Sequence, residues 1–109
     1  MASSFKNAHT PVTTSDTDLY VANGVNQLSA VVHGLFLSNT GDTANVAVTV
    51  KVFDFTNNNA RTILSNTPIP ANSTLTLDKP LNLEPNDKII VSATNSDCEA
   101  FASVLELYP

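Results

Sequence analysis

Residues that could act in catalysis or bind a metal are few and widely spaced in this 109-residue chain. His9 and His33 are its two histidines, and Cys98 is its one cysteine. A zinc site needs three or four ligands brought together, and the sequence has no closely spaced pair of histidines. Cys98 lies between Asp97 and Glu99, and neighbouring negative charges raise the pKa of a thiol and suppress its reactivity. The sequence therefore predicts neither a zinc centre nor a cysteine nucleophile.

Calcium is the better metal candidate, because aspartates recur in or near the expected turns. Calcium takes about six to eight oxygen ligands, mostly from clustered carboxylates. Here the aspartates are spread one to a turn, and Asp16 and Asp18 form their only close pair. We expect solvated acids and no cofactor, although the sequence leaves a calcium site created by folding open. The turn aspartates are Asp42, Asp54, Asp78, Asp87 and Asp97.

Other catalytic signatures are missing as well. Serine is abundant, but no Gly-x-Ser-x-Gly sequence provides the sharp turn that exposes a nucleophilic serine. The chain has only 3 glycines, too few for a loop that surrounds a phosphate. We therefore predict that the chain is not an enzyme.

The charge balance also limits the possible partners. The formal net charge is −5, and the five basic residues are scattered along the chain without forming a cluster. Nucleic-acid affinity rests largely on Lys and Arg neutralising phosphates, and anionic membrane surfaces attract the same residues. We expect no nucleic-acid and no membrane partner. The N-terminus lacks the apolar run of a signal peptide, and a single cysteine excludes an internal disulfide, which favours synthesis in a reducing compartment.

Alternating apolar and polar residues predict β-strands over most of the chain. Residues 45–55 alternate strictly, with Val46, Val48, Val50 and Val52 on one side. Turn signals rich in Asn, Asp and Pro recur every 8–12 residues or so. The pattern predicts one all-β domain over residues 17–109. It should be an antiparallel β-sandwich of seven to eight strands, either Ig-like or jelly-roll-like.

The strand expected at residues 28–38 is apolar on both sides, which indicates that both sides are covered. One side should face the core, and the other a neighbouring chain. Strict alternation assigns Leu28, Ala30, Val32, Gly34 and Phe36 to the first side. The predicted partner contacts on the second side are Val31, His33, Leu35 and Leu37.

Residues 1–16 are polar and are predicted to form an extended N-terminal arm. Such a segment buries too little surface to offset its ordering entropy of about 1–2 kcal/mol per residue. We therefore expect a neighbouring subunit, or the surface of a larger assembly, to order it, with Phe5 as the anchor because of its large apolar area. Cys98 is expected in the polar turn over residues 95–99.

Several segments together resemble small β-sandwich virion proteins of tailed bacteriophages. They are Asp18-Leu19-Tyr20, Leu35-Phe36-Leu37-Ser38-Asn39-Thr40, the valine-rich strand at 46–52, Thr67-Pro68-Ile69-Pro70-Ala71-Asn72-Ser73-Thr74-Leu75, Leu81-Asn82-Leu83-Glu84-Pro85-Asn86-Asp87 and Val104-Leu105-Glu106-Leu107. Related-looking sequences often have Gly where this chain has Asn72 and Asn86, and Asn can adopt the same backbone. The resemblance covers residues 13–107 and brings no catalytic residue.

The resemblance implies a structural virion protein made in the host cytoplasm. Such a protein would be a capsid decoration, or cement, protein that binds the major capsid protein, or an accessory part of the neck, tail or fibre. It would also associate with itself as a dimer or trimer. A carbohydrate- or surface-binding module is a third alternative. That reading is weakened because sugar sites usually use aromatic platforms, and the chain has no Trp and only Tyr20 and Tyr108 as tyrosines.

Overall fold

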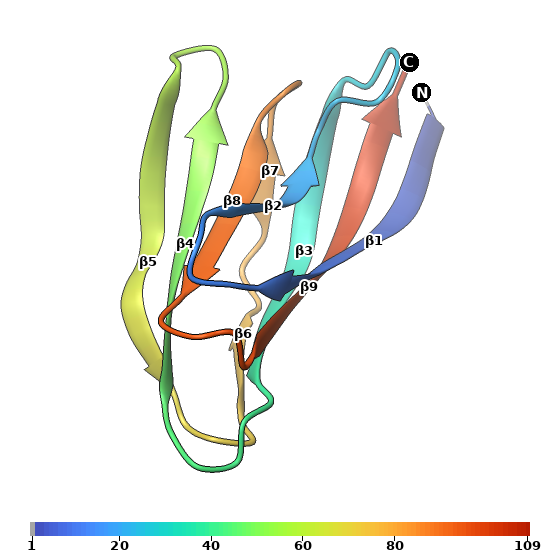
Figure 1. Cartoon of the computed structure of the whole chain (residues 1–109). Coiled ribbons are helices and arrows are strands. Elements are labelled where there is room, and N and C mark those ends of the chain that lie inside the picture. Colours follow the sequence, from blue (N-terminus) through green and yellow to red (C-terminus); the bar gives the residue numbers. More distant parts are fainter. Residues whose placement is uncertain (1) are drawn as a thin grey trace.

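The computed structural model describes residues 2–109, which form two antiparallel β-sheets with no helix. This part of the chain thus contains no helix long and apolar enough to cross a membrane. The larger sheet has the order β1-β9-β3-β6, with β7 also pairing with β3, and the smaller has the order β2-β8-β4-β5 (Figure 1). The strands are β1 (Ala2–Val12), β2 (Thr17–Val21), β3 (Ser29–Asn39), β4 (Val46–Asp54), β5 (Asn59–Ile69), β6 (Thr74–Leu77), β7 (Leu81–Leu83), β8 (Lys88–Ala93) and β9 (Cys98–Tyr108). The predicted all-β sandwich is confirmed, with nine strands over residues 2–109 instead of seven to eight.

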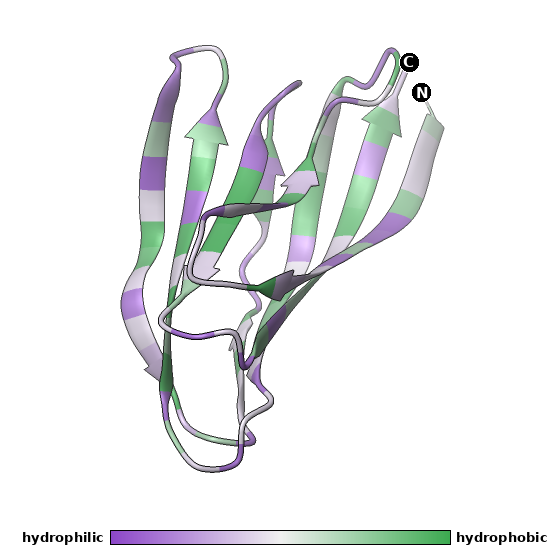
Figure 2. Cartoon of the chain, viewed as in Figure 1, coloured by the Kyte–Doolittle hydropathy of each residue, from purple (hydrophilic) through white to green (hydrophobic). Residues whose placement is uncertain are grey.

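The core lies between the two sheets and consists of side chains from alternate strand positions. In β4, the predicted face is correct: Val46, Val48 and Val50 have no exposed surface, and Val52 is half-buried against them. Leucines and valines of β3 and β9 contribute from the larger sheet. The hydropathy colouring shows the alternation along the strands (Figure 2). Burial of this aliphatic layer is the main stabilising contribution to the fold.

Asparagines take the left-handed backbone at the turns, where many proteins use glycine. Asn58, Asn72 and Asn86 have φ values of 50°, 57° and 72°. Asn tolerates this region because its short polar side chain can hydrogen-bond locally. The two positions where related-looking sequences have glycine, Asn72 and Asn86, therefore keep the same turn geometry.

A β-bulge in β3 changes which side chains face the core. Val32 pairs with Val104 and Gly34 pairs with Ser103, so His33 is the extra residue on β3. An extra residue reverses the alternation beyond it. Leu35 and Leu37 are consequently buried, with exposed fractions of 1% and 0%. The expectation that they contact a partner was wrong, because strict alternation along 28–38 does not hold across the bulge.

The predicted N-terminal arm contains an edge strand of the larger sheet. β1 pairs with β9 in unbroken register, from Ala2 opposite Tyr108 to Val12 opposite Cys98. The two ends of the described chain consequently lie side by side (Figure 1). Nearly all β1 side chains are exposed or half-buried, and only Val12 is buried. The expectation that a neighbouring subunit must order the segment was wrong, because backbone hydrogen bonding to β9 needs no buried side chains.

Cys98 begins β9 and is 1% exposed, so its expected position in a polar turn was wrong. It pairs with Val12 on one side and Asn39 on the other. Burial, together with the charge of Glu99, raises the pKa of its thiol to about 11. The thiol therefore stays protonated near neutral pH, which makes it a poor nucleophile.

Replacing Cys98 with serine should lower stability, by about 1–3 kcal/mol, because it places a hydroxyl in an apolar site. Denaturant unfolding would measure the loss. Cys98→Ala is the matched control, since it adds no polar atom, and it should lose less. A serine variant as stable as the wild type would contradict the apolar environment of this position.

A buried hydrogen-bond cluster joins the two sheets at the end of the sandwich where the chain ends meet. Glu106 of β9 is 5% exposed, and its carboxylate accepts hydrogen bonds from Tyr20 at 2.5 Å and Tyr108 at 2.6 Å. Gln27 donates to the Tyr20 hydroxyl at 3.0 Å and accepts from the Gly24 amide at 2.8 Å. Burial raises the pKa of Glu106, but hydrogen bonds from both tyrosines and the charge of Lys6 outweigh it, and the net pKa is lowered.

Candidate assembly interface

The outward side of the larger sheet presents rows of large side chains across neighbouring strands. In the first row, Phe5 of β1, Leu105 of β9 and Val31 of β3 occupy directly paired positions. Phe5 is 78% exposed, whereas Val31 and Leu105 are half-buried. Phe5 also contacts His33, edge to face, with ring centroids 6.2 Å apart. This row brings three residues predicted as partner contacts, Phe5, Val31 and His33, onto one surface.

A second row of rings crosses the same three strands. His9 of β1, Phe101 of β9 and Phe36 of β3 occupy paired positions. The rings of His9 and Phe101 are parallel within 6°, with centroids 6.3 Å apart. Phe36 and Phe101 are tilted by 53° at the same centroid distance. Such ring contacts between neighbouring strands stabilise the sheet surface that carries them.

The two rows lie on the same outward side of the larger sheet, separated by Asn7, Ser103 and Gly34, and together we call them the aromatic face. It consists of Phe5, His9, Val31, His33, Phe36, Phe101 and Leu105.

The bulge in β3 positions Phe36 on the aromatic face. Beyond the extra residue His33, Phe36 points outward while Leu35 and Leu37 point inward. Gly34 leaves room for the Phe36 ring, because a Cβ at position 34 would lie 3.3 Å from that ring. A phenylalanine over a strand glycine covers the exposed backbone. One irregularity in β3 thus supplies leucines to the core and a ring to the surface.

Sequence reasoning found only part of the aromatic face. It identified Phe5, Val31 and His33, but the rings of the second row, His9, Phe36 and Phe101, were not predicted as contacts. Alternation along residues 98–108 places Phe101 and Leu105 on one side of a strand and could have indicated that half of the face. No comparable signal connects His9 to it, because the pairing of β1 with β9 joins opposite ends of the chain.

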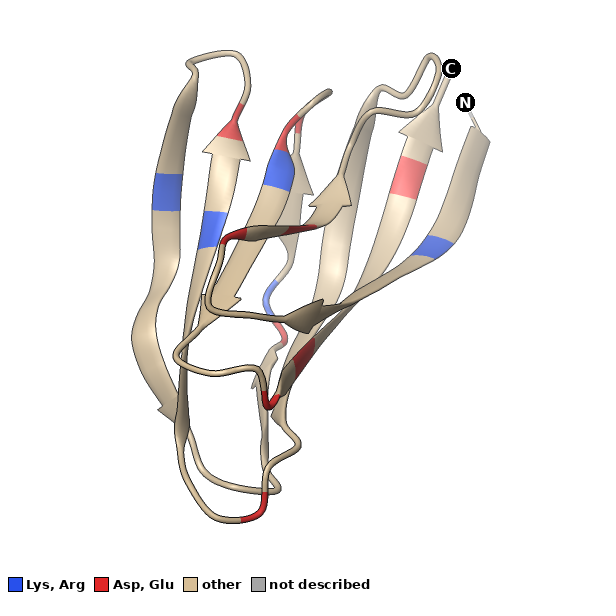
Figure 3. Ribbon diagram, viewed as in Figure 1, with Lys and Arg blue, Asp and Glu red and all other residues tan. Residues whose placement is uncertain are grey.

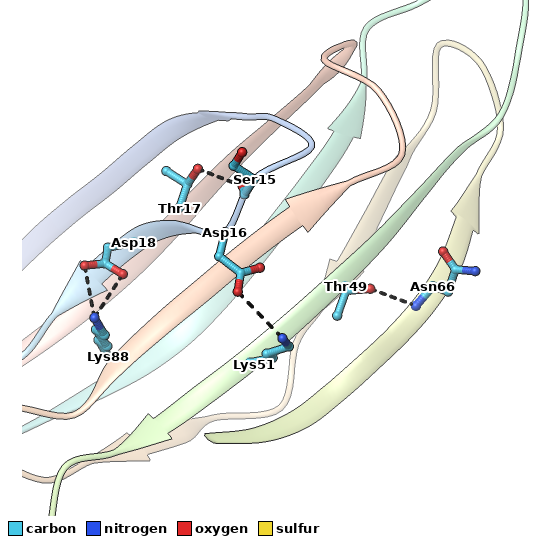
Figure 4. Close-up of polar contacts among 8 residues, drawn as sticks. All are labelled: Ser15, Asp16, Thr17, Asp18, Thr49, Lys51, Asn66 and Lys88. Carbon is cyan, nitrogen blue, oxygen red and sulfur yellow. Dashed lines mark hydrogen bonds and ion pairs between the residues drawn. The ribbon is translucent and has the colours of Figure 1, made fainter. Parts of the chain in front are cut away.

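The outer side of the smaller sheet differs in character, because oppositely charged groups pair across it. Lys51 Nζ lies 3.7 Å from an Asp16 carboxylate oxygen, and Lys88 Nζ lies 3.3 Å from Asp18 (Figure 4). On the larger sheet, by contrast, few residues of β1, β9 and β3 are charged (Figure 3). Among the described outward positions of these three strands, Glu99 is the one residue that is Asp, Glu, Lys or Arg. The two sides of the sandwich therefore offer a partner different chemistry.

The smaller sheet also borders a groove of about 410 Å³, which Phe53, Phe55 and Lys88 help to line. The Lys88 ammonium lies 5.6 Å from the Phe53 ring centroid, within the usual range of a cation–π contact. Lys88 also pairs with Asp18, which lines the same groove. The two charged groups of this groove thus pair with each other.

Three acidic residues from two separate places in the chain converge on folding: Asp54 at the end of β4, and Glu84 and Asp87 of one turn, have carboxylate oxygens within 4.8 Å of one another. Asp87 is 5% exposed and accepts hydrogen bonds from the backbone amides of Phe55 at 2.9 Å and Glu84 at 3.0 Å. Asp54 accepts from Asn57 at 2.7 Å, which lowers its pKa. These bonds give the acids a role in fixing two turns. The sequence did not predict that Glu84 joins Asp54 and Asp87.

The sequence matches no profile of a known protein family and no curated protein. Solved structures with the same fold include a chain of the acid-stable capsid of Helicobacter pylori bacteriophage KHP30. It aligns over 100% of this chain and 90% of its own length, with a TM-score of 0.60 and 14% identity. A chain of the infectious bursal disease virus particle aligns over 97% of this chain, with a TM-score of 0.60 and 8% identity.

This chain spans only 31% of the length of that bursal disease virus protein. A chain of Bacillus endospore appendages, which are disulfide-linked pili, also has the fold, with a TM-score of 0.56 and 9% identity. That alignment covers 98% of this chain and 87% of the appendage chain. The fold is thus shared with proteins of virus particles and of endospore pili.

Proposed function

We propose that this chain is a structural protein of a virus particle and that it decorates the outer surface of a tailed-phage head by binding the major capsid protein. The single observation that carries the proposal is the aromatic face, an outward sheet surface with exposed rings and almost no charge. Exposed apolar patches of this kind mark protein interaction sites. The shared fold with a phage capsid chain supports the same direction.

The chemistry of the aromatic face suits a stable protein contact. Phenylalanine is enriched at interfaces, and each buried aromatic ring removes about 150–250 Å² from water. Phe5 and Phe101 are 78% and 38% exposed, so a partner can cover them. Because Glu99 is the one charged group among the outward positions of β1, β9 and β3, docking there would desolvate few charges.

The opposite side of the sandwich suits exposure to solvent. Its Asp16–Lys51 and Asp18–Lys88 pairs keep charges at the surface. The net charge of −5 would also keep the chain from competing for packaged DNA. With one side docked and the other in water, each copy would lie flat on the shell.

Phe101→Asp should weaken attachment to undecorated particles at least about 30-fold, which corresponds to the roughly 2 kcal/mol of an interface hot spot. The binding of purified chain to such particles would be measured in a co-sedimentation assay. Phe55→Asp is the matched control, because Phe55 is also exposed, at 57%, but follows β4 of the smaller sheet. Circular dichroism would verify that both variants fold. Equal binding by both variants would exclude the aromatic face as the docking surface.

The number of copies per virion separates decoration from the alternative role in the neck, tail or fibre. A decoration protein occurs hundreds of times, whereas a neck or tail component occurs roughly six to a few dozen times, as closed rings require. Quantitative mass spectrometry of purified virions measures this number. A low copy number would favour the neck or tail, and absence from virions would overturn both roles.

A further inference from the structure

The four outermost strands of the two sheets differ in how open their free edges are. An edge strand exposes unpaired backbone N–H and C=O groups, and proteins usually protect such edges by shortness, bulges or charges. In the described chain, β1 and β6 are the outermost strands of the larger sheet, and β2 and β5 those of the smaller sheet.

Three of these edges are protected. β6 has 4 residues, and β7 beside it has 3. β2 has 5 residues and a register shift between Asp18 and Tyr20. β5 is long, but its register shifts twice against β4. A further strand could not pair over a long, regular stretch at any of them.

β1 is the exception. It has 11 residues, and its register with β9 contains no shift. Side chains of a strand stand roughly perpendicular to the sheet, so those of β1 leave the backbone edge accessible. Pro11 lacks an N–H group, so regular pairing would be limited to residues 2–10.

The composition of β1 favours a second copy of the same chain as the pairing partner. The chain as a whole carries a net charge of −5, so most approaches of two copies bring like charges together. Residues 2–12 contain no acidic residue and one basic residue, Lys6, so two β1 strands avoid like-charge repulsion in any register that does not place Lys6 opposite Lys6. Phe5, the most exposed ring of the aromatic face, also lies on this edge strand, where a neighbouring copy could cover it.

We propose that two copies of the chain associate by antiparallel pairing of their β1 strands about a two-fold axis. The larger sheets of both copies then form one continuous sheet, and the two aromatic faces become one surface. About a two-fold axis, the free N–H and C=O groups of β1 in one copy form hydrogen bonds with the same groups of β1 in the other copy. This pairing would form in the isolated chain, whether or not the chain belongs to a virus particle.

Amide hydrogen exchange of residues 2–10 tests the pairing directly. In an antiparallel edge strand, successive N–H groups point alternately toward the neighbouring strand and toward solvent. For a free edge, alternate amides exchange fast at every concentration. For the proposed dimer, the amides that point to β9 and those that point away from it both exchange slowly at protein concentrations of about tens of micromolar. On dilution, the amides that point away from β9 become fast, in step with the dissociation measured by analytical ultracentrifugation. A monomer throughout, or a dimer with alternate fast amides, would overturn the proposal.

A pair of charge variants locates the contact. Ser3→Asp with Asn7→Asp places two negative charges on exposed outward positions of β1, and should raise the dimer dissociation constant at least about tenfold, because like charges across a strand pair repel. The control variant, Asn59→Asp with Ser65→Asp, adds the same charge to exposed positions of β5 and should change the dimer dissociation constant less than about threefold. Equal effects of the two variants would overturn the edge location. Protection of β1 amides only when particles are added would assign the edge to another virion protein.

Discussion

Val48→Asp should leave the chain unfolded at room temperature. Val48 lies in the middle of β4, has no exposed surface and pairs with β5 on one side and β8 on the other. A carboxylate there has no partner, and burying an unpaired charge costs several kcal/mol. That cost is comparable to the ~5–15 kcal/mol total stability of a domain. Circular dichroism and thermal unfolding would show the loss of the cooperative transition.

The adjacent residue provides the control. Ala47 is half-buried and points to the outer side of the smaller sheet, so Ala47→Asp introduces the same group one position along the strand. It should cost about 1 kcal/mol or less, as surface changes usually do. If Val48→Asp shifted the unfolding temperature by only a few degrees, the assignment of the valine side of β4 to the core would be refuted.

Removing the Glu106 carboxylate should produce the second large effect. Glu106→Ala leaves the hydroxyls of Tyr20 and Tyr108 without their shared acceptor. Tyr20 is buried, and a buried polar group left unpaired costs about 1–3 kcal/mol, so we expect a loss of about that size in denaturant unfolding. Tyr108 is only half-buried and adds less, because water can replace the lost acceptor. Glu106→Gln is the control, because it keeps the shape and one acceptor oxygen, and it should lose less than half as much. Equal losses for both variants would show that the charge, and not the hydrogen bonding, is what matters.

Glu106 also makes the free energy of unfolding depend on pH. Because the folded-state pKa of Glu106 lies below its ordinary value of 4.5, the ionised carboxylate stabilises the fold above that pH. The contribution is lost as the pH falls through the lowered folded-state value. The difference in unfolding free energy between wild type and Glu106→Gln should therefore shrink on acidification. A difference that stays constant below pH 4.5 would contradict a lowered pKa.

The sandwich and its valine core could be predicted because alternation alone specifies them. In β4 the apolar residues occupy every second position without interruption, so only one side can face the core. β3 gives no such guidance. Its central residues are nearly all apolar, and the one sign of the bulge is Gly34, because an isolated glycine within a strand often marks one.

The N-terminal segment shows a different limit. Its Ser, Thr and Asn residues indicate an arm because their side chains bury little apolar surface. Pairing with β9 supplies backbone hydrogen bonds that no local pattern can reveal. The same pairing assembles the aromatic face from residues nearly a full chain length apart, such as His9 and Phe101. The part of the aromatic face that β1 contributes is thus set by the pairing of β1 with β9, which a local sequence pattern does not show.

The contrast between the two outer sides gives them opposite responses to ionic strength. Added salt screens the exposed Asp16–Lys51 and Asp18–Lys88 pairs within a Debye length of about 10 Å at 0.1 M. The aromatic face has almost nothing to screen, and salts such as sulfate strengthen apolar association. A contact made through the aromatic face would thus persist at high salt concentration, at which particles held together by ion pairs dissociate.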